Sequence, residues 1–150
     1  GYIALGAAYI RKEEYENALD ILSRAILINS KDPNAHYYIG VACRATKDFE
    51  KAATSLHNSV LLKPDSLQTQ YFLGLVLIDC EKFQGACDAF NEALRIKPDF
   101  AEGHYMLGYV YLEKLFDVAK GVYHLSKAEK LYIKLEDFDR LEKVRAMLAK

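Results

Sequence analysis

"HYYIG", at residues 36–40, recurs along the chain at a constant interval. Similar stretches stand at residues 2–6 ("YIALG"), 70–74 ("QYFLG") and 104–108 ("HYMLG"). The glycine that ends each stretch is 34 residues from the next, at Gly6, Gly40, Gly74 and Gly108. A fixed period between about 20 and 50 residues is typical of stacked supersecondary units. The sequence therefore predicts a repeat architecture.

Each repeat unit contains two apolar patterns with the spacing of a helix. In the second unit the first pattern follows i, i+3, i+4, i+7 and consists of His36, Ile39, Gly40 and Cys43. After a polar turn at residues 46–48, the second pattern consists of Phe49, Ala52, Ala53, Leu56, Ser59 and Val60. No stretch alternates as a half-buried strand does. We therefore expect an all-α chain of antiparallel helix pairs.

Helix boundaries and a glycine register support this interpretation. Asp32 and Pro33 fit an N-cap followed by a first-turn proline. Asp99 and Glu102 have the spacing of a capping box. A mid-helix glycine costs about 0.8–1 kcal/mol relative to alanine, so four glycines at one register need a compensating gain. We expect that gain to be close helix contact, with each glycine facing small residues of the second helix, at Ala18, Ala52 and Ala86 and at Ala25, Ser59 and Ala93.

The residues that carry these patterns resemble the tetratricopeptide repeat family over nearly the whole chain. The matching residues are Ile39, Gly40, Ala52, Leu56 and Pro64 in the second unit, and Leu73, Gly74, Ala86, Phe90, Ala93 and Pro98 in the third. The resemblance implies a right-handed superhelical α-solenoid of antiparallel helix pairs. We expect one domain over residues 1–150, with repeats at about 1–32, 33–66, 67–100 and 101–135 and a capping helix at about 137–149.

Departures from the family pattern concentrate in the last unit. The usual tryptophan is replaced in every unit, by Tyr2, His36, Gln70 and His104. The fourth unit fits only if its internal turn, around residues 114–116, is one residue longer, so that Gly121, Leu125 and Ala128 take the places of Ala86, Phe90 and Ala93. Beyond it, helical spacing of Phe138, Leu141, Val144 and Leu148 predicts a helix that caps the last apolar face.

Composition and motifs argue against several functional classes. A net charge of −1 gives no basic excess for nucleic acid, and no run reaches the roughly 18 apolar residues of a membrane span. No two of the four histidines have the i, i+4 spacing of a helical metal site. The chain has no phosphate-binding glycine loop, and no general base stands near a cysteine. We therefore expect neither an enzyme nor a bound cofactor or metal.

Cysteine usage bears on the compartment. Cys43, Cys80 and Cys87 form neither a disulfide framework nor a zinc-binding pattern. Reduced thiols favour a cytoplasmic location, with the periplasm as the alternative. Gly1 is not a natural start, so we expect sequence upstream of it, where a targeting segment could lie.

A second apolar stripe follows the first helix of each unit. The resemblance implies that these helices line a concave groove where partners bind. The predicted groove consists of Ile3, Ala7, Tyr37, Val41, Arg44, Tyr71, Leu75, Ile78, Tyr105, Tyr109 and Leu112. The alternative is that its tyrosines pack between neighbouring helices. Five of these groove places carry no cation that could bind an acidic peptide: Ile3, Ala7, Val41, Tyr71 and Leu75. The chain is therefore predicted not to be a receptor for the acidic C-terminal tails of heat-shock chaperones.

Three functional hypotheses follow. The first is a protein–protein interaction scaffold or adaptor whose groove holds an apolar or amphipathic segment of a partner. Exposed apolar patches on proteins usually mark such binding sites. In size and groove character it would be chaperone-like, similar to secretion chaperones that hold hydrophobic translocators. The second is an assembly module whose groove is filled by another copy or by another part of its own chain. The third is the regulatory module of a larger enzyme.

Overall fold

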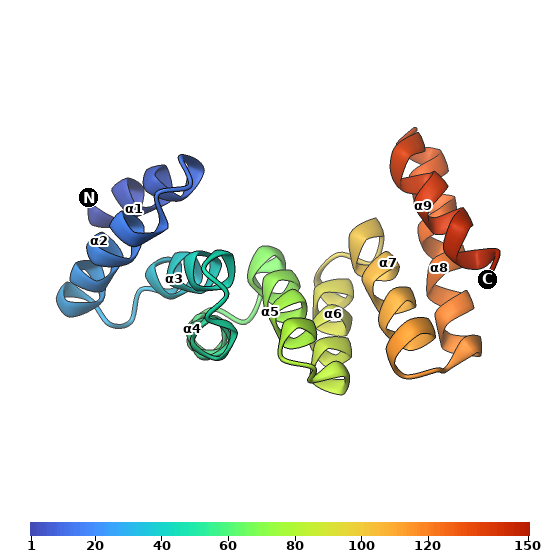
Figure 1. Cartoon of the computed structure of the whole chain (residues 1–150), viewed down its shortest axis with the longest axis horizontal. Helices are drawn as coiled ribbons and strands as arrows, with labels where there is room; N and C mark the ends of the chain where they lie inside the picture. Colours follow the sequence, from blue (N-terminus) through green and yellow to red (C-terminus); the bar gives the residue numbers. More distant parts are fainter. The chain divides into compact units, whose positions relative to one another are not determined.

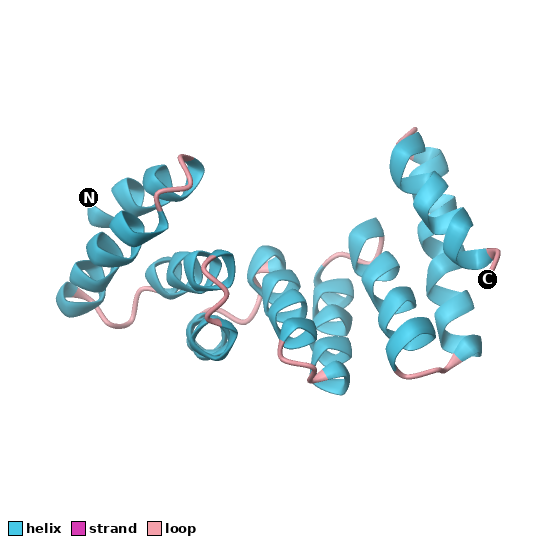
Figure 2. Ribbon diagram, in the orientation of Figure 1, coloured by secondary structure: helices cyan, strands magenta, loops and turns pink.

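The computed structural model describes all 150 residues, and every regular element in it is a helix (Figure 2). The all-α prediction and the prediction of helix pairs joined by short turns are confirmed. The elements are α1 (Tyr2–Arg11), α2 (Tyr15–Ile28), α3 (Pro33–Ala45), α4 (Phe49–Leu62), α5 (Leu67–Asp79), α6 (Phe83–Ile96), α7 (Ala101–Tyr109), the π-helical turn η1 (Val110–Lys114), α8 (Val118–Lys134) and α9 (Phe138–Leu148).

The chain forms two compact units, unit 1 (Gly1–Glu81) and unit 2 (Lys82–Lys150), which are described separately. Unit 1 contains α1 to α5, and unit 2 contains α6 to α9 with η1 (Figure 1). In unit 1, α1 packs on α2, α3 packs on α4, and each pair contacts the first helix that follows it. In unit 2, α7 packs on α8, and α8 also carries α9.

Side-chain caps fix the start of several helices. The Asp32 carboxylate accepts a hydrogen bond from the Asn34 amide at 2.9 Å, with Pro33 in the first turn, so this predicted boundary is confirmed. The predicted capping box at Asp99 and Glu102 is wrong. The N-cap of α7 is Phe100, which keeps the 34-residue interval of the N-caps Asp32 and Ser66 and makes no side-chain cap. Asp99 lies one residue too early to cap the helix.

In the first, second and fourth helix pairs, a glycine of the first helix packs against a leucine of the second helix. A Cβ added at Gly6 would lie 2.6 Å from Leu22 Cγ, and one at Gly40 would lie 2.5 Å from Leu56 Cγ. Such distances are far inside van der Waals contact, so only glycine lets the leucine pack against the helix backbone. Close contact is therefore confirmed, but the nearest atoms belong to a leucine rather than to the predicted small residues, which are also buried.

The turns inside the helix pairs place a residue other than glycine in the left-handed region. The φ angles are 61° at Glu13, 66° at Lys47 and 58° at Glu81, at the 34-residue interval. In the fourth repeat the equivalent residue is Phe116 (φ 56°), which lies one residue later than the 34-residue interval predicts. The extra residue is absorbed by η1, where the Leu115 amide bonds to the Val110 carbonyl five residues back. The longer turn predicted for this unit is confirmed.

The last helix covers the apolar face of α8. Leu141, Val144 and Met147 of α9 are buried in one cluster with Leu125, Ala128 and Tyr132 of α8. Of the residues predicted to form this face, Phe138 is exposed and Leu148 only half-buried, whereas Met147 takes a buried place. Phe138 is the first residue of α9, next to the Asp137 cap that accepts from the Arg140 amide, and the buried face begins one turn later, at Leu141.

Candidate functional site

The first helices of the second and third repeats meet in unit 1 through aromatic rings. The Tyr37 ring of α3 lies edge-on to the Phe72 ring of α5, with centroids 5.7 Å apart. Tyr71 adds a second edge-on contact to Phe72 at 6.2 Å, and Tyr38 adds one to Tyr37 at 5.1 Å. Edge-on aromatic pairs at these distances add to the energy of burial. Two predicted groove residues, Tyr37 and Tyr71, therefore belong to one aromatic run.

A pocket of about 310 Å³ opens beside this run. It is lined by Val41, Arg44, Ala45, Lys47, Phe49, Phe72 and Asp79. Arg44 Nε donates to Asp79 Oδ2 at 2.8 Å, which joins α3 to α5. Val41 and Arg44 were predicted groove residues, and Asp79 was not. The signal for Asp79 was available: it follows Arg44 by one repeat plus one residue and carries the opposite charge.

Most predicted groove residues are only partly covered. Ile3, Tyr37, Val41, Arg44, Tyr71, Leu75 and Ile78 of unit 1 are all half-buried, whereas Ala7 is buried and offers a partner little surface. Burial raises the pKa of the Tyr37 hydroxyl to about 12, with a smaller contribution from neighbouring Tyr38. Tyr37 therefore stays neutral and contributes mainly apolar surface.

The predicted groove residues of unit 2 lie against its core. Tyr105, Tyr109 and Leu112 are half-buried and pack on the buried cluster of α8 and α9. Lys114 Nζ lies 6.0 Å from the centroid of the Tyr109 ring and 5.7 Å from that of Phe83. The ammonium therefore covers the faces of two aromatic rings, where a cation is attracted electrostatically. In this unit the stripe serves core packing and also keeps a partly open surface.

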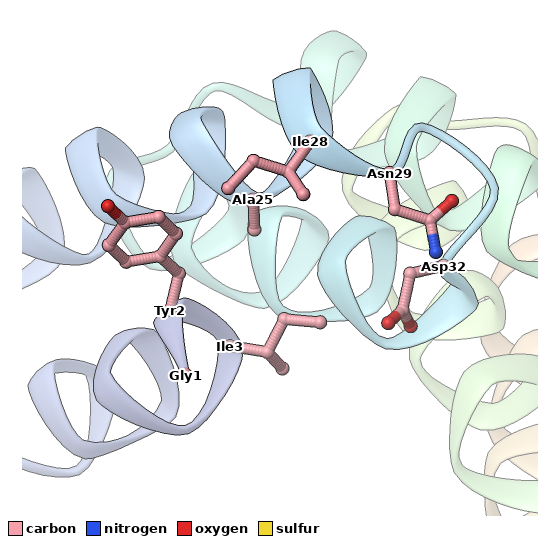
Figure 3. A pocket seen from close by; sticks show the side chains of 7 residues that line it. All are labelled: Gly1, Tyr2, Ile3, Ala25, Ile28, Asn29 and Asp32. Carbon is pink, nitrogen blue, oxygen red and sulfur yellow. The ribbon is translucent and has the colours of Figure 1, made fainter.

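A second pocket, of about 500 Å³, opens beside the start of α1 (Figure 3). Tyr2 and Ile3 of α1 face Ala25 and Ile28 of α2 across it, as Figure 3 shows. In the second repeat, Ser59 takes the place of Ala25 and its hydroxyl donates to the Pro33 carbonyl in the first turn of α3, at 2.9 Å. The first repeat has no such bond, because Ala25 carries no hydroxyl, and we assign no ligand to the pocket.

Two histidines that sequence spacing did not connect meet in unit 2. His104 Nδ1 of α7 lies 3.1 Å from His124 Nδ1 of α8, and His104 Nε2 lies 3.1 Å from the Pro98 carbonyl oxygen. A proton on His104 Nε2 donates to that carbonyl, so His124 Nδ1 donates to His104 Nδ1 when both rings are neutral. Burial lowers the pKa of His124 to about 4, with a contribution from His104, and burial also lowers the pKa of His104.

Two of the three cysteines, Cys43 and Cys87, are buried. Burial is the main cause that raises the pKa of both the Cys43 and the Cys87 thiols, which keeps them protonated at neutral pH. No three histidine, cysteine or acidic side chains cluster as a metal site would require. None of the helices combines the length and apolar character needed to cross a membrane.

Helix pairs held by a glycine–leucine contact and repeated every 34 residues define a helical repeat protein. A family model described as TPR repeat matches residues 74–114. A second one, of tetratricopeptide type and described as anaphase-promoting complex, cyclosome, subunit 3, matches residues 11–93, more than half of the chain. The chain belongs to the tetratricopeptide repeat family.

Solved structures agree on the fold. A structure of MamA is similar with a TM-score of 0.85 and 22% identity, and the match covers 91% of this chain and 79% of that chain. A structure described as YrrB, a TPR protein with an unusual peptide-binding site, has a TM-score of 0.79 and 22% identity, with 87% and 66% covered. At such identities the similarity shows the fold alone. No curated protein matches the chain.

Proposed function

We propose that this chain is a protein-interaction module that binds an apolar or amphipathic segment of a partner protein along α3 and α5. The observation that carries the proposal is the half-buried run of Tyr37, Phe72 and Tyr71 beside an open pocket. Aromatic side chains supply broad contact area at a low cost in conformational entropy, and tyrosine tolerates water when no partner is bound. Membership of a family that binds protein partners supports the same proposal.

The partly covered apolar side chains of α5 add to this surface. Tyr71 and Leu75 are one helical turn apart and share a face, and both are half-buried. A helix that packs on one side only is polar on the other, whereas α5 is apolar on both. Burying such a surface against a partner removes it from water and lowers the free energy. The chain therefore has both an anchor and a neighbouring apolar strip for a bound segment.

The test uses a displayed library of random twelve-residue peptides, selected on the wild-type chain. Bound peptides are then measured against Tyr71→Ala and Leu75→Lys, made separately, and each variant should weaken binding by roughly 30-fold. The matched control is Leu61→Lys, which makes the same change at a residue of α4 that is 79% exposed. Folding of each variant is checked by its thermal midpoint. Peptides that bind both folded variants as tightly as the wild type would contradict the proposal.

Self-association is the second candidate, favoured by exposed apolar residues outside the predicted groove. Leu27 of α2 is 86% exposed and Leu61 of α4 is 79% exposed. Sedimentation velocity over a hundredfold range of concentration separates the two functions. A mass that rises with concentration, and falls again in Leu61→Lys, supports an assembly module. A constant monomer mass supports the interaction module.

A further inference from the structure

The pocket beside the aromatic run has a cationic edge that the other repeats lack. Arg44 and Lys47 both line it. The residues equivalent to Arg44 are Ile10, Ile78 and Leu112, and those equivalent to Lys47 are Glu13, Glu81 and Phe116. Helix packing therefore does not require a cation at either place, because three other repeats are built without one. The two cations distinguish the second repeat.

One carboxylate only partly neutralises this edge. Asp79 accepts from Arg44 Nε at 2.8 Å, and the two side chains are 23% and 37% exposed. A guanidinium carries five N–H donors, so four donors of Arg44 remain beyond the one that this bond uses. Lys47 adds an exposed ammonium from the turn before α4. The pocket thus presents two cations and a single carboxylate.

The pocket is also lined by apolar side chains from three helices. Val41 comes from α3, Phe49 from the start of α4 and Phe72 from α5. A volume of about 310 Å³ is at the lower end of the range for small-molecule sites, and the pocket is open to solvent. It suits one or two inserted side chains rather than a whole cofactor. A side chain that entered it would bring its neighbours in sequence to Arg44 and Lys47.

We propose that the partner segment inserts an apolar side chain here and sets an aspartate or glutamate beside it, against Arg44 and Lys47. The inference rests on the proposed function, since it specifies the partner of the same surface. Charge complementarity carries it: the two cations line the pocket together with apolar side chains, and a partner carboxylate gains a charge-assisted hydrogen bond from the remaining donors of Arg44. Charges of this kind act mainly on specificity and on the rate of association.

The experiment uses the peptides selected from the random twelve-residue library. Their consensus should contain an apolar residue with an aspartate or glutamate next to it or one helical turn away. Replacing that acid by its amide should weaken binding to the wild type by roughly fivefold or more. The double variant R44Q/K47Q should show the same weakening with the original peptide, and no further loss with the amide peptide. The matched control is Lys63→Gln, an exposed lysine outside the pocket.

The outcomes separate the inference from the proposed function. If Leu75→Lys weakens binding as expected while R44Q/K47Q and the amide peptide bind as the wild-type pair does, the inference is overturned and the proposed function stands. Binding that depends on the free C-terminal carboxylate of the peptide, and is lost when it is amidated, also overturns the inference, because the acid is then not a side chain. If the library yields no peptide that binds the wild type, both fail.

Discussion

The second and fourth helix pairs solve one packing problem with turns of different length. In the second pair a Cβ on Gly40 would lie 2.5 Å from Leu56 Cγ, and in the fourth one on Gly108 would lie 2.5 Å from Leu125 Cγ. Yet the first two residues are 16 apart in sequence and the second two are 17 apart. The additional residue is taken up in η1, where hydrogen bonds reach five and six residues back. The contact between glycine and leucine is therefore the same in both helix pairs, and only the geometry of the turn differs.

The same two repeats treat an equivalent histidine differently. His36 Nε2 lies 2.8 Å from the Ser30 carbonyl, and His104 Nε2 lies 3.1 Å from the Pro98 carbonyl. In the third repeat Gln70 donates to the Pro64 carbonyl at 3.2 Å, so the shared role of this place is to bond a carbonyl six residues back. Only His104 also meets a second histidine. Equivalent places thus keep a common backbone contact and differ in what lies behind it.

The largest effect on stability is expected at the two leucines that pack against these glycines, Leu56 in the second helix pair and Leu125 in the fourth. Leu56→Ala and Leu125→Ala each remove a side chain that is 0% exposed, so each should lower the free energy of unfolding by about 2–5 kcal/mol. Denaturant unfolding, followed by NMR signals from α4 and α8, measures both losses. Similar losses of free energy would show that the two helix pairs are equivalent in energy as well as in geometry. A much smaller loss at Leu125 would show that they are not.

A double-mutant cycle sharpens this prediction. Gly40→Ala alone should destabilise by about 1–3 kcal/mol, because its methyl group overlaps Leu56. In a Leu56→Ala background the methyl group has room, so the same change should be neutral or stabilise by up to about 1 kcal/mol. Equal costs of Gly40→Ala in both backgrounds would mean that the leucine is not the partner of the glycine.

Acid should destabilise the fourth pair more than the second. The pKa of His124 is lowered to about 4, from an ordinary value near 6.5, and that of His104 is also lowered. The folded state therefore favours the neutral rings. Their contribution is fully present above pH of about 6.5 and is lost as pH falls from there through about 4. Protonation also places two N–H groups in opposition and breaks the bond between the rings.

The measurement is the urea midpoint of α8 signals relative to α4 signals, at several pH values between 7.5 and 4. His104→Gln is the control, because glutamine keeps the carbonyl bond that Gln70 makes in the third repeat and cannot take up the proton. This variant should lose less stability in acid than the wild type. An identical loss in both would show that His104 and its bond to His124 do not cause the acid effect, and would leave it to the burial of His124 or to other titrating groups.

The smallest effect is expected in the turns. Lys47 and Phe116 adopt φ angles of 66° and 56°, a conformation that costs L-residues about 1–2 kcal/mol and glycine almost nothing. Lys47→Gly and Phe116→Gly should each stabilise by roughly 0.5–1 kcal/mol, after the greater chain entropy of glycine in the unfolded state is subtracted. Thermal midpoints should rise by a few degrees. A fall at Phe116 alone would show that its ring stabilises the longer turn.

Sequence reasoning succeeded where local spacing decides structure. The 34-residue register of Gly40 and its equivalents predicted the helix pairs, and the one-residue offset at Gly121 predicted the longer turn. Both are regular along the chain and need no knowledge of neighbouring helices. The capping box at Asp99 and Glu102 failed because the N-cap of α7 is Phe100, at the register of Asp32 and Ser66, and Glu102 instead pairs with Arg140 at 3.1 Å. The eleven-residue groove stays a prediction.

The sequence by itself determined that this protein is a stack of helix pairs, since apolar periodicity and a repeated glycine specify which face each helix buries. Only the tertiary structure decided that leucine rather than alanine meets that glycine. It also decided that Arg44 reaches Asp79 and that His104 meets His124. The physical reason is that these contacts join residues on different helices. Their distance depends on how far each helix is rotated and shifted against the next, which a periodic pattern along one chain does not encode.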